Sequence, residues 1–224
     1  MIKTVFIDID NTLLDFNESS KECIRQAFLE QGLPYTEKIF PTFKKINDGL
    51  WLKIEKGELD RQGLHKIRFN LVLDALGLSG DGLIIEKRFR EILFDTAIAV
   101  EGARETLKYL ASKYKVYAAS NAIYLQQINR LTKTYMLQYL SGLFISEKLG
   151  VSKPTKEFFD LCMAGANAKK QETIMIGDSI SADIIGANEY GLRTIWYNHN
   201  KEENSKGYMA DYIVEKLSDI KEIL

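Results

Sequence analysis

The stretch TVFIDIDNT at residues 4–12 joins a β-branched, apolar run to a pair of acidic residues. Such a run predicts a short buried strand over Thr4–Ile9. Alternate side chains of a strand point the same way, so Asp8 and Asp10 would lie close together on one face. Two close carboxylates repel each other, and one loses its charge unless a cation is supplied. Taken alone, the stretch also fits a polar strand end with capping residues.

The rest of the chain repeats the change from short β-branched runs to helical patterns, which is typical of a parallel sheet. We therefore predict an α/β fold, a Rossmann-like doubly wound parallel sheet. The expected strands are Val116–Ser120, Gly142–Ser146, Thr173–Gly177, Thr194–Tyr197 and Tyr212–Val214. The expected helices are Ala103–Ser112, Ile123–Thr134, Thr155–Ala164, Ile180–Tyr190 and Leu217–Leu224.

One long segment interrupts this alternation, because residues 16–95 carry only helical patterning. A capping box, Ser19 with Glu22, opens the first of four apolar stripes at helical spacing. We expect residues 1–15 and 96–224 to form the sheet-based core and residues 16–95 to form an inserted helical cap domain.

Composition narrows the possible classes of protein. The 224 residues carry 30 Lys and Arg against 31 Asp and Glu, a formal charge of −1, which argues against a dedicated nucleic-acid binder. Hydrophobic residues make up 46%, which is ordinary for a globular protein. Only Cys23 and Cys162 are present, too few for a disulfide framework. Neither a signal-peptide pattern nor a membrane-length apolar run is found, so we expect a cytoplasmic protein with no membrane contact.

Further carboxylates follow the expected strand at Thr173–Gly177. Asp178 comes directly after that strand, and Asp183 lies five residues later. Ligands of open parallel sheets bind outside the carboxyl ends of the strands, so these residues should meet Asp8 and Asp10 at one edge. Oxygen ligands of this kind suit a hard divalent cation, and Mg²⁺ fits best if a phosphate shares it. The alternative is a merely acidic loop after the strand.

Three more polar residues are candidates for binding an anion at the same edge. Ser120 and Asn121 follow the second strand, where a hydroxyl, an amide and backbone N–H groups begin a helix. Ser120 could also serve as a simple N-cap, and the two roles are compatible. Lys153 precedes Pro154 and could neutralise phosphate charge as a point cation, although a lone lysine is more often solvated surface.

Taken together, the set resembles the four motifs of the haloacid dehalogenase superfamily, in order and in spacing, over the whole chain. The motifs here are Asp8-x-Asp10-x-Thr12, Ser120, Lys153-Pro154 and Gly177-Asp178-x4-Asp183. The helical insert resembles the C1-type cap of that superfamily. A closer resemblance is to its pyrimidine 5′-nucleotidase subgroup, and it rests on residues 46–51 (INDGLW), 144–154 (FISEKLGVSKP) and 192–198 (LRTIWYN). One departure is Val100-Glu101-Gly102, where relatives usually carry a proline before that glycine, and it touches only a helix entry.

The resemblance implies a phosphomonoesterase with a small-molecule substrate, a pyrimidine (deoxy)nucleoside monophosphate. Asp8 would be the nucleophile that forms an aspartyl-phosphate, and Asp10 would be the general acid and base. Mg²⁺ would be held by Asp8, Asp178 and the backbone carbonyl of Asp10, and Asp183 would orient the water ligands of the metal. The phosphoryl oxygens would be held by Thr12, Ser120, Asn121 and Lys153.

Other functions remain to be weighed against this one. A dehalogenase of the superfamily lacks the aspartate found at Asp10 and needs no Mg²⁺, which argues against dehalogenation. A phosphatase of phosphoglycolate or of a sugar phosphate, or a phosphomutase, would use the same core residues. A non-catalytic binding module should have lost one of Asp8, Asp10, Lys153 or Asp178, and none is lost.

Substrate choice must come from the insert, because the core motifs contact only the phosphoryl group. Asn47 and Trp51 lie four residues apart and share a helix face, so they could present an amide and a ring to a nucleobase. Phe16, just after the first motif, could cover the site. Packing of Trp51 inside the cap is the simpler alternative. The sequence does not define the oligomeric state.

Overall fold

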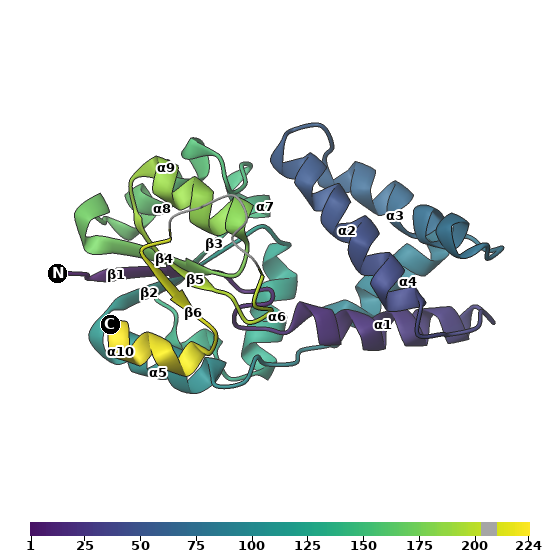
Figure 1. Ribbon diagram of the computed structural model, residues 1–224, viewed down its shortest axis with the longest axis horizontal. Helices are drawn as coiled ribbons and strands as arrows, with labels where there is room; N and C mark the ends of the chain where they lie inside the picture. Colours follow the sequence, from purple (N-terminus) through teal and green to yellow (C-terminus); the bar gives the residue numbers. More distant parts are fainter. Residues whose placement is uncertain (203–209) are drawn as a thin grey trace. The chain divides into compact units, whose positions relative to one another are not determined.

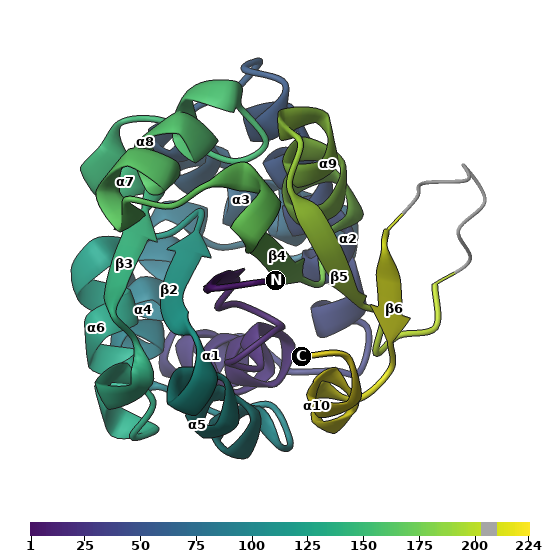
Figure 2. The ribbon, with the colours of Figure 1, turned by 90° about the vertical axis from the view of Figure 1, so that its left-hand side faces the viewer.

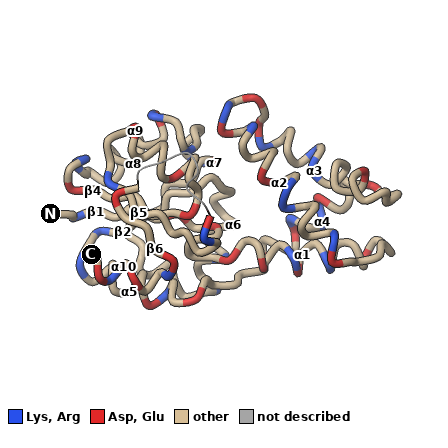
Figure 3. The backbone as a smooth tube through the Cα atoms, in the orientation of Figure 1, with Lys and Arg blue, Asp and Glu red and all other residues tan. Residues whose placement is uncertain are grey.

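The computed structural model describes residues 1–202 and 210–224, and these fall into two compact units. The first unit contains Met1–Asp15 and Ala97–Leu224, and the second contains Phe16–Thr96. Figure 1 shows strands in the first unit and helices alone in the second. Acidic and basic residues are interspersed in both units, in keeping with the net charge of −1 (Figure 3).

Within the described residues, the first unit is built on a six-stranded parallel sheet with the order β3-β2-β1-β4-β5-β6 (Figure 2). The expected fold class, an α/β doubly wound parallel sheet, is thereby confirmed. β1 pairs with β2 on one side and with β4 on the other, in register from Thr4 to Ile7. The strands are β1 (Thr4–Ile7), β2 (Lys115–Ser120), β3 (Gly142–Ile145), β4 (Thr173–Gly177), β5 (Arg193–Tyr197) and β6 (Tyr212–Val214).

Helices cover both faces of this sheet, so its strands are apolar on both sides. Val5 and Ile7 pack into one cluster with α5 and α6, whereas Phe6 packs into another with α8 and α9. The α-helices of this unit are α5 (Ala103–Lys113), α6 (Tyr124–Lys133), α7 (Ser146–Leu149), α8 (Lys156–Ala166), α9 (Gly186–Tyr190) and α10 (Ile220–Ile223). A π-helical segment, Ile180–Ile185, leads directly into α9.

The strand order places a change of direction between β1 and β4. From β1 the chain moves outward through β2 and β3, and it then returns to the other side of β1 to add β4, β5 and β6. Open parallel sheets bind ligands at this switch point, outside the carboxyl ends of the strands. The residues after Ile7 and after Gly177 occupy that position.

The second unit consists of α1 (Phe16–Glu30), α2 (Ile39–Glu55), α3 (Arg61–Leu76) and α4 (Gly82–Asp95). The side chain of Asp60 accepts a hydrogen bond from the Gly63 N–H and so begins α3, and left-handed Gly77 ends it. Phe28, Phe43, Phe69 and Phe89 form most of the contacts between aromatic rings in the core of this unit.

Element boundaries differ from the sequence expectations by a few residues. β1 ends at Ile7 rather than Ile9, because the chain then turns and the N–H groups of Leu13 and Leu14 both donate to the Ile9 carbonyl. The expected helix Ile180–Tyr190 is π-helical over its first half. None of the helices in the described part of the chain combines the length and the apolar character needed to cross a membrane.

Candidate active site

Asp8 lies at the switch point, one residue past the end of β1. Its backbone N–H donates to the Ile176 carbonyl at 2.8 Å and thereby extends the β1–β4 pairing. The residue is 7% exposed, and its Oδ1 lies 2.6 Å from Nζ of Lys153. Burial is the main cause that raises the pKa of Asp8 to about 7, although the Lys153 ammonium opposes the rise. An acidic side chain this deeply placed needs nearby positive charge to stay ionised.

Lys153 supplies positive charge from the loop between α7 and α8. Its Nζ lies 2.6 Å from each of three acceptors: Asp8 Oδ1, Asp183 Oδ1 and the Ala119 carbonyl. The residue is only 2% exposed, so it is not a solvated surface lysine. Burial alone would lower the pKa of Lys153, but the charges of Asp183 and Asp8 outweigh it and raise that pKa above its ordinary value.

Asp178 and Asp183 complete a group of three carboxylates with Asp8. One oxygen from each of the three lies within 4.8 Å of the others. The Thr12 hydroxyl donates to Asp178 Oδ1 at 2.9 Å, so Thr12 reaches this group. Burial and the charges of Asp8 and Asp183 raise the pKa of Asp178 well above its usual range. Three carboxylates around one point, two of them buried and that of Asp178 half-buried, therefore leave a deficit of positive charge, even with Lys153 present.

Three local features fix the acidic residues that follow β4. The indole Nε1 of Trp196, on the neighbouring strand β5, donates to the Asp178 carbonyl at 3.0 Å. The Ser179 N–H donates to Asp183 Oδ2 at 3.1 Å. Gly177 lets this carboxylate approach the strand, since a Cβ there would lie 2.1 Å from Asp183 Oδ2. Glycine is therefore required by close packing at this position.

These residues fit a magnesium ion. Mg²⁺ prefers carboxylate and carbonyl oxygens, and three converging carboxylates supply hard ligands and negative charge. A bound cation would also offset the burial and the mutual repulsion that raise the pKa values of Asp8 and Asp178. Asp183 already uses Oδ1 for Lys153 and Oδ2 for the Ser179 N–H, which suits it to orienting ligands rather than to direct coordination.

The side chain of Asp10 is directed elsewhere than this group. Its Oδ1 lies 2.6 Å from Nη1 of Arg130, and its Oδ2 accepts from Nε2 of Gln127 at 2.6 Å. Both partners lie on α6, and sequence reasoning did not single out either of them. The available signal was a glutamine and an arginine three residues apart on one helix face, but nothing local indicates a partner at residue 10.

Ser120 and Asn121 follow β2 at the same edge of the sheet. Ser120 is 2% exposed, in keeping with a place inside the site. The side chain of Asn121 pairs with the backbone of Lys153: its amide oxygen accepts from the Lys153 N–H and its amide nitrogen donates to the Lys153 carbonyl, both at 2.9 Å. The Asn121 side chain therefore holds the loop that carries Lys153.

The predicted substrate residues of the helical unit differ from one another in their contacts. Asn47 is buried in α2, and its Oδ1 accepts from Nη1 of Arg68 at 2.9 Å. This hydrogen bond occupies the amide oxygen of Asn47 with a partner from the same helical unit. Trp51, one turn later, is partly exposed and is absent from the buried core of this unit, whereas Phe16 packs against that core.

Arg68 and Glu86 form a buried ion pair beside Asn47. Nη2 and Nε of Arg68 lie 2.7 Å and 3.0 Å from the two oxygens of Glu86, and the guanidinium lies 4.9 Å from the ring centroid of Phe89. His65 Nδ1 lies 2.7 Å from Glu86 Oε1, so His65 belongs to this cluster rather than to the open surface or a loop. Burial alone would raise the pKa of Glu86, but the hydrogen bond with His65 and the charge of Arg68 hold that pKa below its usual value.

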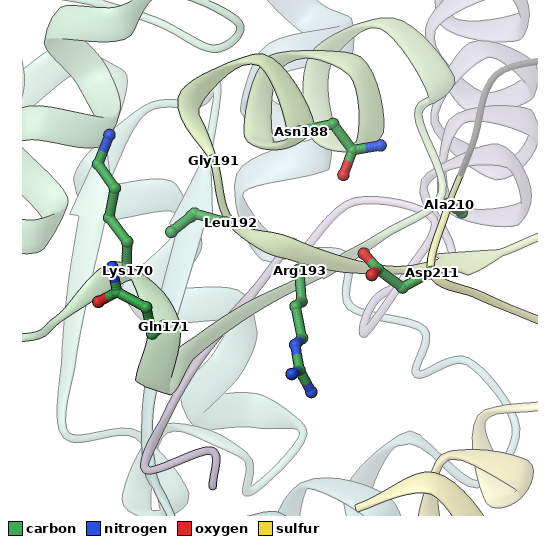
Figure 4. Close-up of a pocket in the computed structure, with 8 residues that line it drawn as sticks. All are labelled: Lys170, Gln171, Asn188, Gly191, Leu192, Arg193, Ala210 and Asp211. Carbon is green, nitrogen blue, oxygen red and sulfur yellow. The ribbon is translucent and has the colours of Figure 1, made fainter.

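A surface pocket lies at the amino ends of the strands, opposite to the end of the sheet that carries the acidic residues (Figure 4). Lys170 and Gln171 precede β4, Arg193 begins β5 and Asp211 precedes β6, so the pocket is at the amino ends of these strands. Asp8 and Asp178 follow the carboxyl ends. The pocket is therefore separate from the acidic site.

The chain is similar to known proteins over most of its length. A family model described as haloacid dehalogenase-like hydrolase matches residues 2–191. The pyrimidine 5′-nucleotidase PynA of Streptococcus pneumoniae is 32% identical over 99% of this chain and 94% of its own, and the pyrimidine 5′-nucleotidase YjjG of Escherichia coli is 27% identical over 98% and 96%.

A solved structure shares the fold over its full length. It is the magnesium-bound HAD-hydrolase YfnB of Bacillus subtilis, with a TM-score of 0.93 and 30% identity over 100% of this chain and 98% of the other. The family model covers most of the chain, and the similarity to PynA extends over nearly the full length of both proteins. With its acidic residues at the carboxyl ends of β1 and β4, the chain belongs to the haloacid dehalogenase-like hydrolases.

Proposed function

We propose that the protein is a Mg²⁺-dependent phosphomonoesterase that acts through an aspartyl-phosphate on Asp8. The observation that carries the proposal is the group of converging carboxylates Asp8, Asp178 and Asp183, with Lys153 bound to two of them. Asp10 is retained two residues after Asp8, which is the feature expected of a phosphoryl-transfer enzyme rather than a dehalogenase.

In the first step, an oxygen of Asp8 attacks phosphorus as the bond to the leaving oxygen breaks, and Asp10 gives its proton to that oxygen. In the second step, Asp10 takes a proton from water, whose oxygen attacks phosphorus and releases Asp8 and phosphate. Lys153, which contacts Asp8, and the hydroxyls of Thr12, which contacts Asp178, and of Ser120 are the groups that would contact phosphoryl oxygens.

Asp8, Asp178 and the backbone carbonyl of Asp10 are the groups that would hold Mg²⁺, with Asp183 orienting its water ligands. When bound, the cation would supply positive charge that offsets the phosphoryl oxygens and the clustered carboxylates. The magnesium-bound YfnB structure, 30% identical over the whole chain, supports the choice of metal.

Pyrimidine nucleoside 5′-monophosphates are the proposed substrates, and residues 16–95 are the proposed cap that selects the leaving group. Support comes from two full-length relatives named pyrimidine 5′-nucleotidases, at 32% and 27% identity. Trp51 is the cap residue best suited to contact a base, because its ring is partly exposed and Asn47 already binds Arg68.

The test is a phosphate-release screen with and without Mg²⁺. The panel contains p-nitrophenyl phosphate, pyrimidine and purine nucleoside 5′-monophosphates, a hexose phosphate and phosphoglycolate. We expect Mg²⁺-dependent turnover with the highest kcat/KM for a pyrimidine nucleotide. A preference for phosphoglycolate or the hexose phosphate would overturn the proposed substrate class but leave the proposed phosphatase activity intact. If no compound of the panel is hydrolysed, both proposals are overturned.

A variant pair tests the cap. Trp51→Ala should lower kcat/KM for the best nucleotide far more than for p-nitrophenyl phosphate, which has no nucleobase. Leu52→Ala is the control, because Leu52 is the neighbouring residue and is 47% exposed. An equal loss on both substrates with Trp51→Ala would mean that Trp51 only holds the cap together.

A further inference from the structure

The carboxylate of Asp10 is bound on both oxygens by side chains of α6. Nη1 of Arg130 lies 2.6 Å from Oδ1, and Nε2 of Gln127 lies 2.6 Å from Oδ2. Nη1 of Arg130 also donates to Oε1 of Gln127 at 3.2 Å. The three side chains therefore form a closed ring of hydrogen bonds, with a different donor on each carboxylate oxygen.

The members of this ring of hydrogen bonds differ in their exposure to solvent. Gln127 and Arg130 are both fully buried, whereas the side chain of Asp10 is 26% exposed. A buried guanidinium is costly unless a carboxylate compensates its charge, and here that carboxylate is Asp10. The ring thus holds Asp10 from the protein interior and leaves part of the carboxylate accessible.

Proton transfer places a strict demand on such a carboxylate. An acid or base must lie within hydrogen-bond distance of the atom it serves, and a displacement of about 1 Å can cost on the order of 10²-fold in rate. An aspartate held on one side only could turn about its side-chain bonds. Two donors in fixed positions on one helix prevent that rotation.

We infer that Arg130 and Gln127 are positioning residues that orient Asp10 for proton transfer to the leaving group. The inference rests on the proposed phosphomonoesterase function and deepens it. A purely structural alternative is that the ring only ties α6 to the loop after β1. Both ideas predict lower stability when the ring is broken, but only orientation of the acid predicts a loss that depends on the leaving group.

The experiment compares Gln127→Leu and Arg130→Met with the wild type on substituted phenyl phosphates of similar size. Controls are Gln126→Leu, the adjacent glutamine, and Lys133→Met, an exposed cation on the same helix. Nitrophenolate leaves without a proton, whereas unsubstituted phenolate needs one. Since an acid contributes roughly 10²–10⁴-fold, kcat/KM should fall about tenfold or more further for phenyl phosphate than for p-nitrophenyl phosphate. The controls should show no such dependence.

Arg130→Lys provides a rescue, because an ammonium can still donate to Asp10 Oδ1, and it should recover part of the phenyl phosphate activity. Melting curves establish that each variant is folded at the assay temperature. If Arg130→Met does not fold, Gln127→Leu gives the same readout. If the wild type is active but the two variants lose kcat/KM equally on all the aryl phosphates, or lose none, the inference alone is overturned. A wild type inactive on every aryl phosphate would overturn the proposed function and the inference with it.

Discussion

Nζ of Lys153 lies 2.6 Å from Oδ1 of Asp8, although 145 positions separate the two residues in the chain. The same ammonium binds Asp183 and the Ala119 carbonyl, so it joins the loop between α7 and α8 to the ends of β1 and β2 and to the segment after β4. One buried cation therefore connects the ends of three neighbouring strands at the candidate site.

Lys153→Met should destabilise the protein by roughly 3–5 kcal/mol, because removing one partner leaves buried carboxylates without their compensating charge. Denaturant unfolding at pH 7 measures the loss. Lys156→Met is the matched control: Lys156 also pairs with an aspartate, Asp160, but at the surface, and its loss should change little. Similar curves for the two variants would show that Lys153 is not electrostatically required.

Asp8→Asn should reduce turnover by at least about 10³-fold, since an amide cannot attack phosphorus. The side chain keeps its size, so the variant should remain folded, as a melting curve would confirm. Asp15→Asn, in the following loop, is the control. Turnover by Asp8→Asn near the wild-type rate would remove Asp8 as the nucleophile.

Millimolar Mg²⁺ should raise the Tm of the wild type, because a ligand that binds only the folded state adds about 2.7 kcal/mol at 100 times its Kd. Asp178→Asn should lose most of that shift, whereas Asp160→Asn, an exposed carboxylate outside the cluster, should keep it. An unchanged wild-type Tm, or the same shift in both variants, would contradict a metal site at Asp178. Scanning fluorimetry over a Mg²⁺ titration provides the measurement.

Gly177→Ala should destabilise the protein by about 1–3 kcal/mol and impair activity, because the new Cβ would displace the Asp183 carboxylate. Gly49→Ala is the opposite case. Gly49 lies inside α2 with no atom within 4 Å of an added Cβ, so alanine should stabilise by about 0.5–1 kcal/mol. Unfolding curves of both variants decide this, and a stabilised Gly177→Ala would refute the close approach.

Arg68→Met should destabilise the protein by roughly 3–5 kcal/mol at neutral pH, since it leaves Glu86 buried and ionised. The pKa of Glu86 is lowered in the folded protein, so its stabilising contribution is complete above the ordinary value of 4.5 and is lost as the pH falls through the lowered value. The cost of the substitution should therefore shrink in acid.

Unfolding measured at pH 7 and near pH 4 tests this dependence. The double variant Arg68→Met/Glu86→Leu is the control, because replacing both partners by apolar groups removes the unpaired charge. A penalty for Arg68→Met that is independent of pH, or a double variant no more stable than the single one, would contradict the role of this ion pair.

Most of the fold could be predicted because each strand is a short β-branched run that is buried as a unit. The runs at Thr173–Gly177 and Tyr212–Val214 have the predicted bounds. The acidic residues after β1 and β4 could be placed together because parallel strands present their carboxyl ends at one edge. That argument requires only the order of the elements.

Partners chosen by side-chain direction could not be predicted in the same way. Asn121 was expected to hold an anion, but its amide matches the backbone of Lys153, 32 positions away. Arg130 lies 120 positions from Asp10, and Arg68 lies 21 from Asn47. These pairings depend on how helix faces meet after the chain has folded, which periodicity does not report.

The adjacency of β1 and β4 also has a consequence for biosynthesis. Asp8 emerges from the ribosome early, but Asp178 and Asp183 follow a strand that begins at Thr173. β1 has its second neighbour only after more than 160 further residues have been added, so long-range pairing completes the site. The growing chain therefore cannot bring its three carboxylates together before Asp183 has been added, so a nascent polypeptide that stops short of this residue lacks the complete acidic group.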